Sequence, residues 1–162
     1  MSETVAQNQT VTSFSKYIIN TIDGIMNSLC GLDAQQLNWR PPAPESNSLF
    51  VIATHALMST QENILKILAG LPAEQLPLKA VTRDEIFSAS GNTTERLMED
   101  WSKLRSQLES QFIAITEKDL VREVDHPRRG KISGLEVLLA VTSHMAEHLG
   151  HAELTRDLVK AL

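Results

Sequence analysis

Apolar residues recur every three or four positions in four long stretches of the chain, the spacing that places side chains on one face of an α-helix. The four stretches cover residues 12–32, 49–69, 93–115 and 133–158. Amphipathic helices in one domain bury their apolar faces against one another. The pattern therefore predicts an all-α fold, a four-helix bundle.

Local signals mark several of the expected helix ends. Gly31 follows the first stretch and Gly70-Leu71-Pro72 follows the second, as is common after a last helical turn. Ser46 or Ser48 is placed to cap the second helix. Ser133-Gly134-Leu135-Glu136 matches the capping box, so we expect the fourth helix to begin at Ser133.

The segments between the helices break the helical period. Arg40-Pro41-Pro42-Ala43-Pro44 cannot continue a helix, because proline lacks a backbone N–H and restricts the residue before it. No segment alternates apolar and polar residues between turn signals, so we expect no strands. We predict irregular connections at about residues 33–47, 72–92 and 117–132, with one short helix at 84–89.

Length and charge narrow the class of protein. The 162 residues suit one domain, which we place at residues 12–162 behind a flexible, polar N-terminal arm at residues 1–11. The net charge of −5 argues against a nucleic-acid partner, which a basic face would serve. The one short basic cluster, at residues 128–131, is interpreted as a solvated loop.

The cysteine content and the apolar runs of the chain indicate where in the cell the protein is expected. Cys30 is the single cysteine, so no disulfide can form within the chain, which fits a reducing compartment. We found neither a signal peptide nor an apolar run long enough to cross a membrane. We therefore expect a cytoplasmic protein without a membrane partner.

Histidines concentrate near the end of the chain, where His144, His148 and His151 fall within eight residues. His144 and His148 are four residues apart, so both project from one face of a helix and can bind one divalent metal ion. His55, on the apolar face of the second helix, can supply a third ligand if the second and fourth helices are neighbours. Three protein ligands leave a position open for water or substrate.

The sequence also allows other interpretations of these residues. The histidines can simply pack in the core, and His126 is expected to be a solvent-exposed loop residue. His144-Met145-Ala146-Glu147-His148 also matches the inverzincin protease pattern, although those sites belong to larger α+β domains. Glu62 shares the face of His55 but lies about 10.5 Å further along the axis, which makes it a poor fourth ligand.

Three segments together resemble the DinB-like superfamily of small, four-helix metal-binding proteins over nearly the full chain. They are residues 32–41 after the first helix, residues 47–57 with His55, and residues 144–151, followed by Arg156. His144 and His148 match the superfamily's ligand pair, whereas His151 replaces a frequent glutamine. The resemblance implies an open three-histidine site of His55, His144 and His148 for zinc or nickel.

The resemblance also implies a class of activity. Some relatives are thiol transferases or isomerases that use low-molecular-weight thiols, others have no known activity, and many form homodimers. One hypothesis is therefore a metal-dependent enzyme, a transferase or hydrolase that activates a small thiol or water, with Glu147 or His151 orienting a ligand or relaying a proton. The alternative is a non-catalytic metal-binding or metal-stabilised bundle with a closed site.

Overall fold

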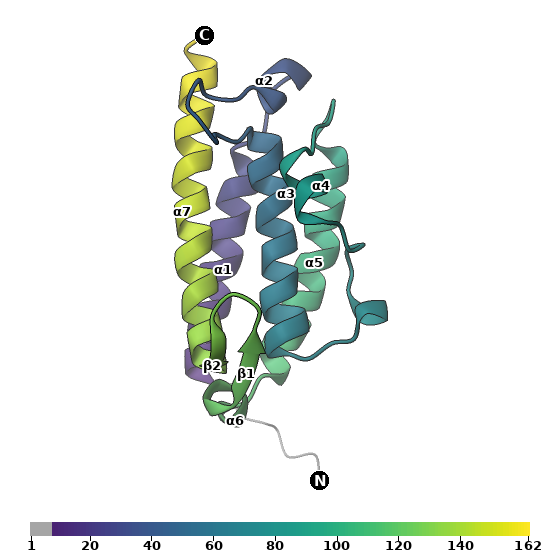
Figure 1. Ribbon diagram of the computed structural model, residues 1–162, viewed down its shortest axis with the longest axis vertical. Helices are drawn as coiled ribbons and strands as arrows, with labels where there is room; N and C mark the ends of the chain where they lie inside the picture. The colour runs from purple at the N-terminus through teal and green to yellow at the C-terminus, as the bar shows by residue number, and fades with distance from the viewer. Residues whose placement is uncertain (1–7) are drawn as a thin grey trace.

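The protein is a helical bundle built from four long helices, as the computed structural model in Figure 1 shows; it describes residues 8–162. The long helices are α1 (Gln9–Asn27), α3 (Leu49–Thr60), α5 (Glu95–Ala114) and α7 (Gly134–Lys160). The predicted all-α class is confirmed. Residues 1–7, most of the predicted N-terminal arm, lie outside the described residues.

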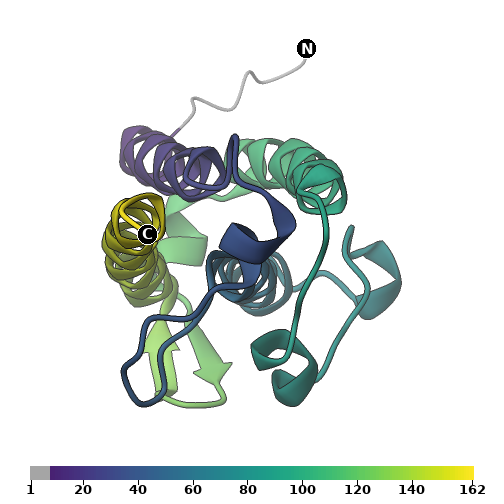
Figure 2. The same ribbon diagram turned by 90° about the horizontal axis from the view of Figure 1, so that it is seen from above.

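The helices α5 and α7 each contact both α1 and α3, and α1 and α3 also contact each other. The view from above in Figure 2 shows α1, α5, α3 and α7 as the four corners. Thr60 hydrogen-bonds Met145, and Leu68 lies against Gly134, so α3 and α7 run antiparallel. The second and fourth predicted helices are therefore neighbours, which is the condition that a shared histidine site requires.

The ends of the first and last helices follow their capping side chains. The Asn8 carboxamide oxygen accepts hydrogen bonds from the backbone N–H groups of Thr10 and Val11, and α1 begins at Gln9. This is three residues before the predicted start at Thr12, because the apolar pattern gives no weight to a polar cap. The predicted capping box is present at Ser133, whose hydroxyl accepts from the Glu136 N–H.

The second long helix changes its winding in its second half. After Thr60 the chain continues as a π-helix, η1 (Gln61–Leu68), whose last turn includes a hydrogen bond from the Ala69 N–H to the Ile64 carbonyl. Gly70 then takes a left-handed conformation at φ 71°, as the predicted stop signal requires.

The connections contain more regular structure than the pattern predicts. Short helices occupy parts of the first two connections, and a helical turn and a two-stranded antiparallel hairpin fill the third. These elements are α2 (Ala34–Asn38), η2 (Ala73–Gln75), α4 (Arg83–Phe87), α6 (Glu117–Val121), β1 (Glu123–His126) and β2 (Gly130–Ser133).

The prediction of an irregular, strand-free segment at residues 117–132 is wrong. The hairpin pairs Glu123 with Ser133 and His126 with Gly130, and Gly130 adopts φ 70° at its turn. Each strand has only four residues, and Val124 is the only one of them that is fully buried, so no alternation was visible in the sequence.

The first two turns of α7 carry more apolar residues than the core takes up. Leu135 and Leu139 are 37% and 51% exposed. Val137 and Val141 take the buried positions instead. Both pairs repeat at a helical spacing, so the period alone does not decide between them.

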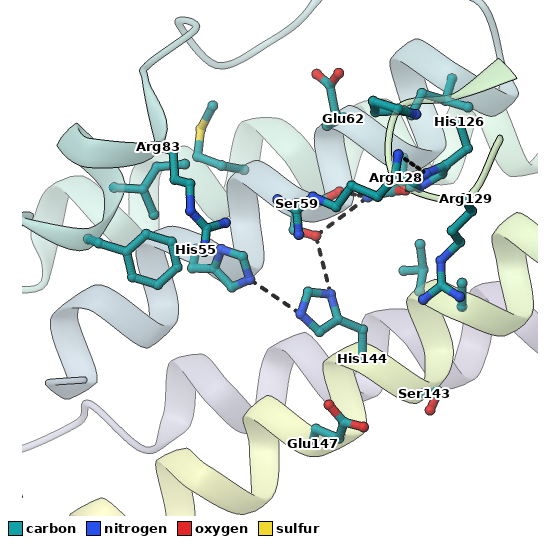
Figure 3. A pocket seen from close by; sticks show the side chains of 18 of the residues that line it. His55, Ser59, Glu62, Arg83, His126, Arg128, Arg129, Ser143, His144 and Glu147 are labelled. Atoms are coloured by element: carbon teal, nitrogen blue, oxygen red, sulfur yellow. Dashed lines mark hydrogen bonds between the residues drawn. The ribbon is translucent and has the colours of Figure 1, made fainter. Parts of the chain in front are cut away.

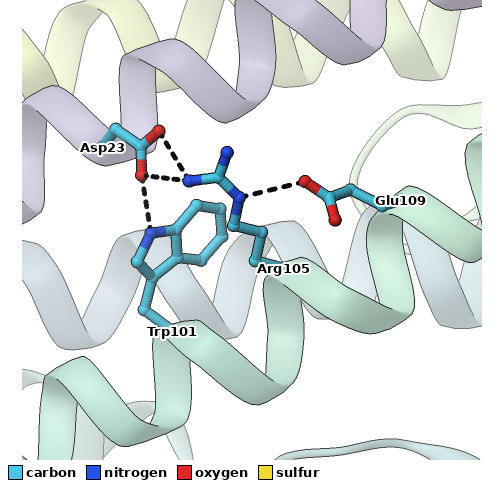
Figure 4. Close-up of polar contacts among 4 residues, drawn as sticks. All are labelled: Asp23, Trp101, Arg105 and Glu109. Atoms are coloured by element: carbon cyan, nitrogen blue, oxygen red, sulfur yellow. Dashed lines mark hydrogen bonds and ion pairs between the residues drawn. The ribbon is translucent and has the colours of Figure 1, made fainter.

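A polar clamp joins α1 to α5 at the edge of the core (Figure 4). The Asp23 carboxylate accepts a hydrogen bond from the buried Trp101 indole N–H at 2.8 Å. It also forms an ion pair with Arg105 at 2.9 Å. Arg105 also bonds Glu109, one turn along α5, at 3.0 Å. The carboxylate thus satisfies an indole that would otherwise be buried without an acceptor.

Within residues 8–162, no helix combines the length and the apolar character needed to cross a membrane.

Candidate metal centre

Three histidines from two antiparallel helices converge on one point between α3 and α7. The Nε2 atom of His144 lies 3.4 Å from Nε2 of His55 and 2.9 Å from Nε2 of His148. One ring nitrogen from each residue lies within 4.8 Å of the other two. The structure thus brings together the three residues that the sequence singled out, although His55 and His144 are 89 positions apart in the chain.

The donor set fits a divalent metal ion. Bonds of about 2.0–2.1 Å from zinc to imidazole in tetrahedral geometry put ligand nitrogens roughly 3.3 Å apart, close to the spacing seen here. Imidazole nitrogens suit zinc, copper, iron and nickel. Nδ1 of His148 is buried without a partner among the described residues, so the ring is not oriented by a competing hydrogen bond there.

Burial holds the cluster in the neutral form that binds metals. Desolvation, followed by the charges of His144, Arg128 and Arg83, lowers the pKa of His55 from 6.5 to about 4. Desolvation and then the charges of the neighbouring histidines lower the pKa of His148 to about 3. The pKa of His144 is also lowered, mainly by burial.

A chain of polar contacts runs from His144 away from the cluster. Nδ1 of His144 faces the Ser59 hydroxyl at 3.4 Å, and the Asn63 amide donates to the Ser59 carbonyl at 2.8 Å. The Asn63 carboxamide oxygen lies 2.9 Å from Nε2 of His126 on the hairpin. If Nε2 of His144 held an ion, Nδ1 would carry the proton and donate a hydrogen bond to Ser59, which would orient the ring.

His126 is therefore a tethered residue, not the freely exposed loop histidine that we expected. Its Nδ1 accepts a hydrogen bond from the Arg128 backbone N–H at 3.1 Å, so Nε2 carries the proton toward Asn63. The ring is half-buried, and it fastens the tip of the hairpin to η1.

The cluster borders a cavity of about 570 Å³, a volume that suits a small organic ligand. His55 and His144 form part of its wall (Figure 3). The other walls come from η1, α4, the hairpin and α7. Among the lining residues are Glu62, Arg83, Phe87, Arg128, Arg129, Ser143 and Glu147.

The three remaining candidate residues fall in different places. Glu147 lines the cavity beside His144, as a residue near the ligands would. His151 is exposed, with its ring 6.0 Å from that of His148 and outside the cavity wall. Glu62 lines the cavity but is absent from the group of converging ligand atoms and pairs with Lys66 at 2.8 Å.

Arg83 and Phe87 extend the site along α4. The Arg83 guanidinium lies 4.7 Å from the centroid of the Phe87 ring, and this ring lies 5.3 Å from that of His55. Neither residue was singled out by the sequence, because the fold alone brings α4 against α3. Ser59, by contrast, follows His55 by one helical turn, so helical spacing was a usable signal for it.

The side chain of Arg156, a residue of α7 that matched the superfamily pattern, binds the chain at the end of α1. Its guanidinium donates to the carbonyls of Ser28 at 2.6 Å and Cys30 at 2.9 Å. A cation at a helix C-terminus satisfies carbonyls that have no partner within the helix.

A helical bundle with three converging histidines beside a cavity defines a class of small metal-binding proteins. The sequence profile of the mycothiol-S-transferase family matches residues 13–161. The chain belongs to this family, which is part of the DinB-like superfamily of metal-dependent thiol transferases. The resemblance drawn from the sequence is thereby confirmed.

A solved structure shows the same fold. The crystal structure of a conserved protein from Enterococcus faecalis aligns with a TM-score of 0.72 over 97% of this chain and 100% of that chain, at 17% sequence identity. No curated protein matches the chain.

Proposed function

We propose that this protein is a metal-dependent S-transferase that joins a low-molecular-weight thiol to an electrophile at His55, His144 and His148. The observation that carries the proposal is the convergence of three neutral imidazoles, two of which, His55 and His144, line a cavity large enough for substrate. Membership of the mycothiol-S-transferase family supports a thiol as the nucleophile. Mycothiol is the first thiol to test.

Zinc or nickel is the ion we propose for the site, because three imidazoles form a borderline donor set. Bound there, such an ion supplies Lewis acidity that lowers the pKa of a thiol. The three imidazoles would hold the ion, and Ser59, which faces Nδ1 of His144, would keep that ring in the orientation that binding needs. The cavity side stays open for substrate.

Glu147 is the residue we propose as proton acceptor. Two carboxylates line the cavity, and Glu62 is already engaged by Lys66. In S-transfer the thiol proton passes to the Glu147 carboxylate, sulfur forms a bond to the electrophilic carbon, and the leaving group departs with its electron pair. A base of this kind contributes typically 10²–10⁴-fold to rate.

The first experiment measures metal content and thiol transfer in the same preparations. Tag-free protein is analysed by ICP-MS, and transfer of mycothiol or another small thiol to monochlorobimane is followed by fluorescence. We expect about one zinc or nickel per chain, and loss of both metal and transfer in His148→Ala.

His151→Gln is the matched control, because it removes an imidazole from the same helix one turn away, outside the group of converging ring nitrogens. Circular dichroism confirms that each variant is folded. If the wild type binds metal but transfers no small thiol, the proposed enzyme activity is contradicted. The alternative of a non-catalytic metal-binding bundle then remains. Absence of metal uptake at neutral pH would contradict both.

We further propose a homodimer in the cytoplasm. Leu139, Leu154 and Leu158 of α7 are 42–59% exposed, and covering them on a second copy would remove apolar surface from water. Multi-angle light scattering of the purified chain tests this assembly, and a monomer at micromolar concentration would contradict it.

A further inference from the structure

Three arginines of the cavity wall have guanidinium groups that form no hydrogen bond or ion pair within the part of the chain that the structure describes. The chain has eight arginines, and the side chains of five hydrogen-bond or ion-pair with other groups. Those five are Arg40, Arg96, Arg105, Arg122 and Arg156. The other three are Arg83, Arg128 and Arg129, and all of them line the cavity beside the histidines.

The three arginines reach the cavity from two separate elements. Arg83 is the first residue of α4, and its guanidinium is placed by the Phe87 ring beside His55. Arg128 and Arg129 form the tip of the hairpin. In Figure 3 Arg83 lies on one side of the histidines and the hairpin arginines lie on the other.

The hairpin tip is held in this position. His126 fastens it to η1 through Asn63 at 2.9 Å and accepts from the Arg128 N–H at 3.1 Å. The Arg129 N–H donates to the His126 carbonyl at 3.2 Å. The backbone that carries both guanidinium groups is thus fixed next to the metal centre, which is the pre-organisation that a binding site needs.

The local charge is opposite in sign to that of the whole chain. The protein carries a net charge of −5, yet its cavity has three guanidinium groups against the carboxylates of Glu62 and Glu147. Glu62 is paired with Lys66. A positive cavity in an acidic protein attracts anions and repels cations.

We propose that Arg83, Arg128 and Arg129 bind an anionic group, a carboxylate or a phosphate, of the molecule that reacts at the histidine cluster. Guanidinium groups match both oxyanions with paired N–H donors. The inference rests on the proposed thiol transfer and adds a substrate class to it. The protein selects charged reactants over uncharged analogues of the same thiol or electrophile.

The first test compares two thiols that differ by one charge. Isothermal titration calorimetry measures binding of N-acetylcysteine and N-acetylcysteinamide to the zinc-loaded full chain. We expect the carboxylate form to bind about fivefold more tightly, as a partly exposed ion pair allows. The ratio falls to about one in the triple variant Arg83→Gln/Arg128→Gln/Arg129→Gln.

Arg96→Gln is the matched control for this test. Arg96 is an arginine of α5 outside the cavity wall, so the variant removes one positive charge without touching the proposed site. We expect it to keep the wild-type ratio. A parallel pair of charged and uncharged electrophiles shows whether the anion belongs to the second reactant. A wild-type ratio of one in both pairs would overturn the inference while leaving thiol transfer intact. A ratio above one that is unchanged in the triple variant would overturn it as well.

A second test does not depend on thiol binding. Inorganic phosphate is titrated into the metal-free full chain, and the arginine Nε–Hε resonances are followed by NMR. We expect saturable shifts of Arg83, Arg128 and Arg129, with the Arg83 shift lost in Arg128→Gln/Arg129→Gln. If the zinc-loaded protein binds no thiol, the proposed function is rejected. Saturable arginine shifts in the phosphate titration would still support the anion site. Resonances that do not move would then overturn the anion site as well.

Discussion

Each histidine of the cluster is held neutral by its surroundings, which links the metal site to the stability of the fold. The pKa of His55 is lowered to about 4 and that of His148 to about 3, first by burial and then by neighbouring positive charge. In the unfolded chain both return to about 6.5. Acid therefore protonates the unfolded state first and favours it.

The metal-free protein is expected to lose stability as the pH falls from about 6.5 toward 4. In this window the unfolded chain binds more protons than the folded one, so the free energy of unfolding decreases with falling pH. Each of His55 and His148 contributes up to about 1.4 kcal/mol per pH unit. Urea unfolding of chelator-treated protein at several pH values measures the slope.

The double variant His55→Phe/His148→Leu removes two of the three titrating imidazoles of the cluster and is expected to weaken this dependence. His151→Gln, which changes an exposed histidine of the same helix, keeps it. A wild-type stability that stays constant between pH 6.5 and 4 would show that the cluster is not held neutral.

At the scale of the elements, the Asp23 clamp is the polar link between α1 and α5. Truncation in Asp23→Ala leaves the buried Trp101 indole without its acceptor and Arg105 without its partner. We expect a loss of about 2 kcal/mol in the free energy of unfolding, measured by urea denaturation. Asp23→Asn, which keeps an oxygen acceptor, costs less.

Glu109→Gln provides the comparison for this clamp. Glu109 bonds the same arginine from an exposed position, and such pairs contribute about 0–1 kcal/mol. Equal losses in Asp23→Ala and Glu109→Gln would mean that the indole hydrogen bond adds nothing.

The long helices could be predicted from the sequence, whereas the short elements could not. Ile18, Ile22 and Ile25 repeat at a helical period because one face of α1 is buried over its whole length. The β1–β2 hairpin has no such periodicity, since most of its side chains are exposed. The π-helix was also missed, because Leu68 still follows the buried Ile64 and Leu65 by four and three positions, as on one face of an α-helix.

The same difference separates the histidines from the arginines of the cavity. His144 and His148 occupy one helix, so their relative position follows from helical geometry alone. Arg128 and Arg83 are 45 positions apart on short elements, and only the tertiary structure places them on one cavity. The residues that were missed are those whose proximity depends on how connections fold back on the bundle.

For the whole molecule, removal of the metal is expected to leave the bundle folded. The core of buried leucines, isoleucines and valines extends through all four long helices and does not depend on the histidines. Circular dichroism of chelator-treated protein therefore retains its helical signal. Added zinc raises the melting temperature in a concentration-dependent way, because it binds the folded state.

His148→Ala separates these two effects. The variant keeps the helical signal, and zinc no longer raises its melting temperature. Loss of helicity on chelation of the wild type would contradict this picture and assign the ion a structural role like that in zinc fingers.

The hairpin has a consequence for how proteins built this way diverge. Glu123 pairs with Ser133, so the chain enters and leaves the hairpin at adjacent points, with the bundle on either side. Substitutions at residues 127–129 can therefore accumulate without shifting α3 or α7, which carry the histidines. In the proposed function, the reactive centre and the choice of reactant are encoded in separate segments, so a lineage could exchange its preferred reactant while inheriting the same chemistry.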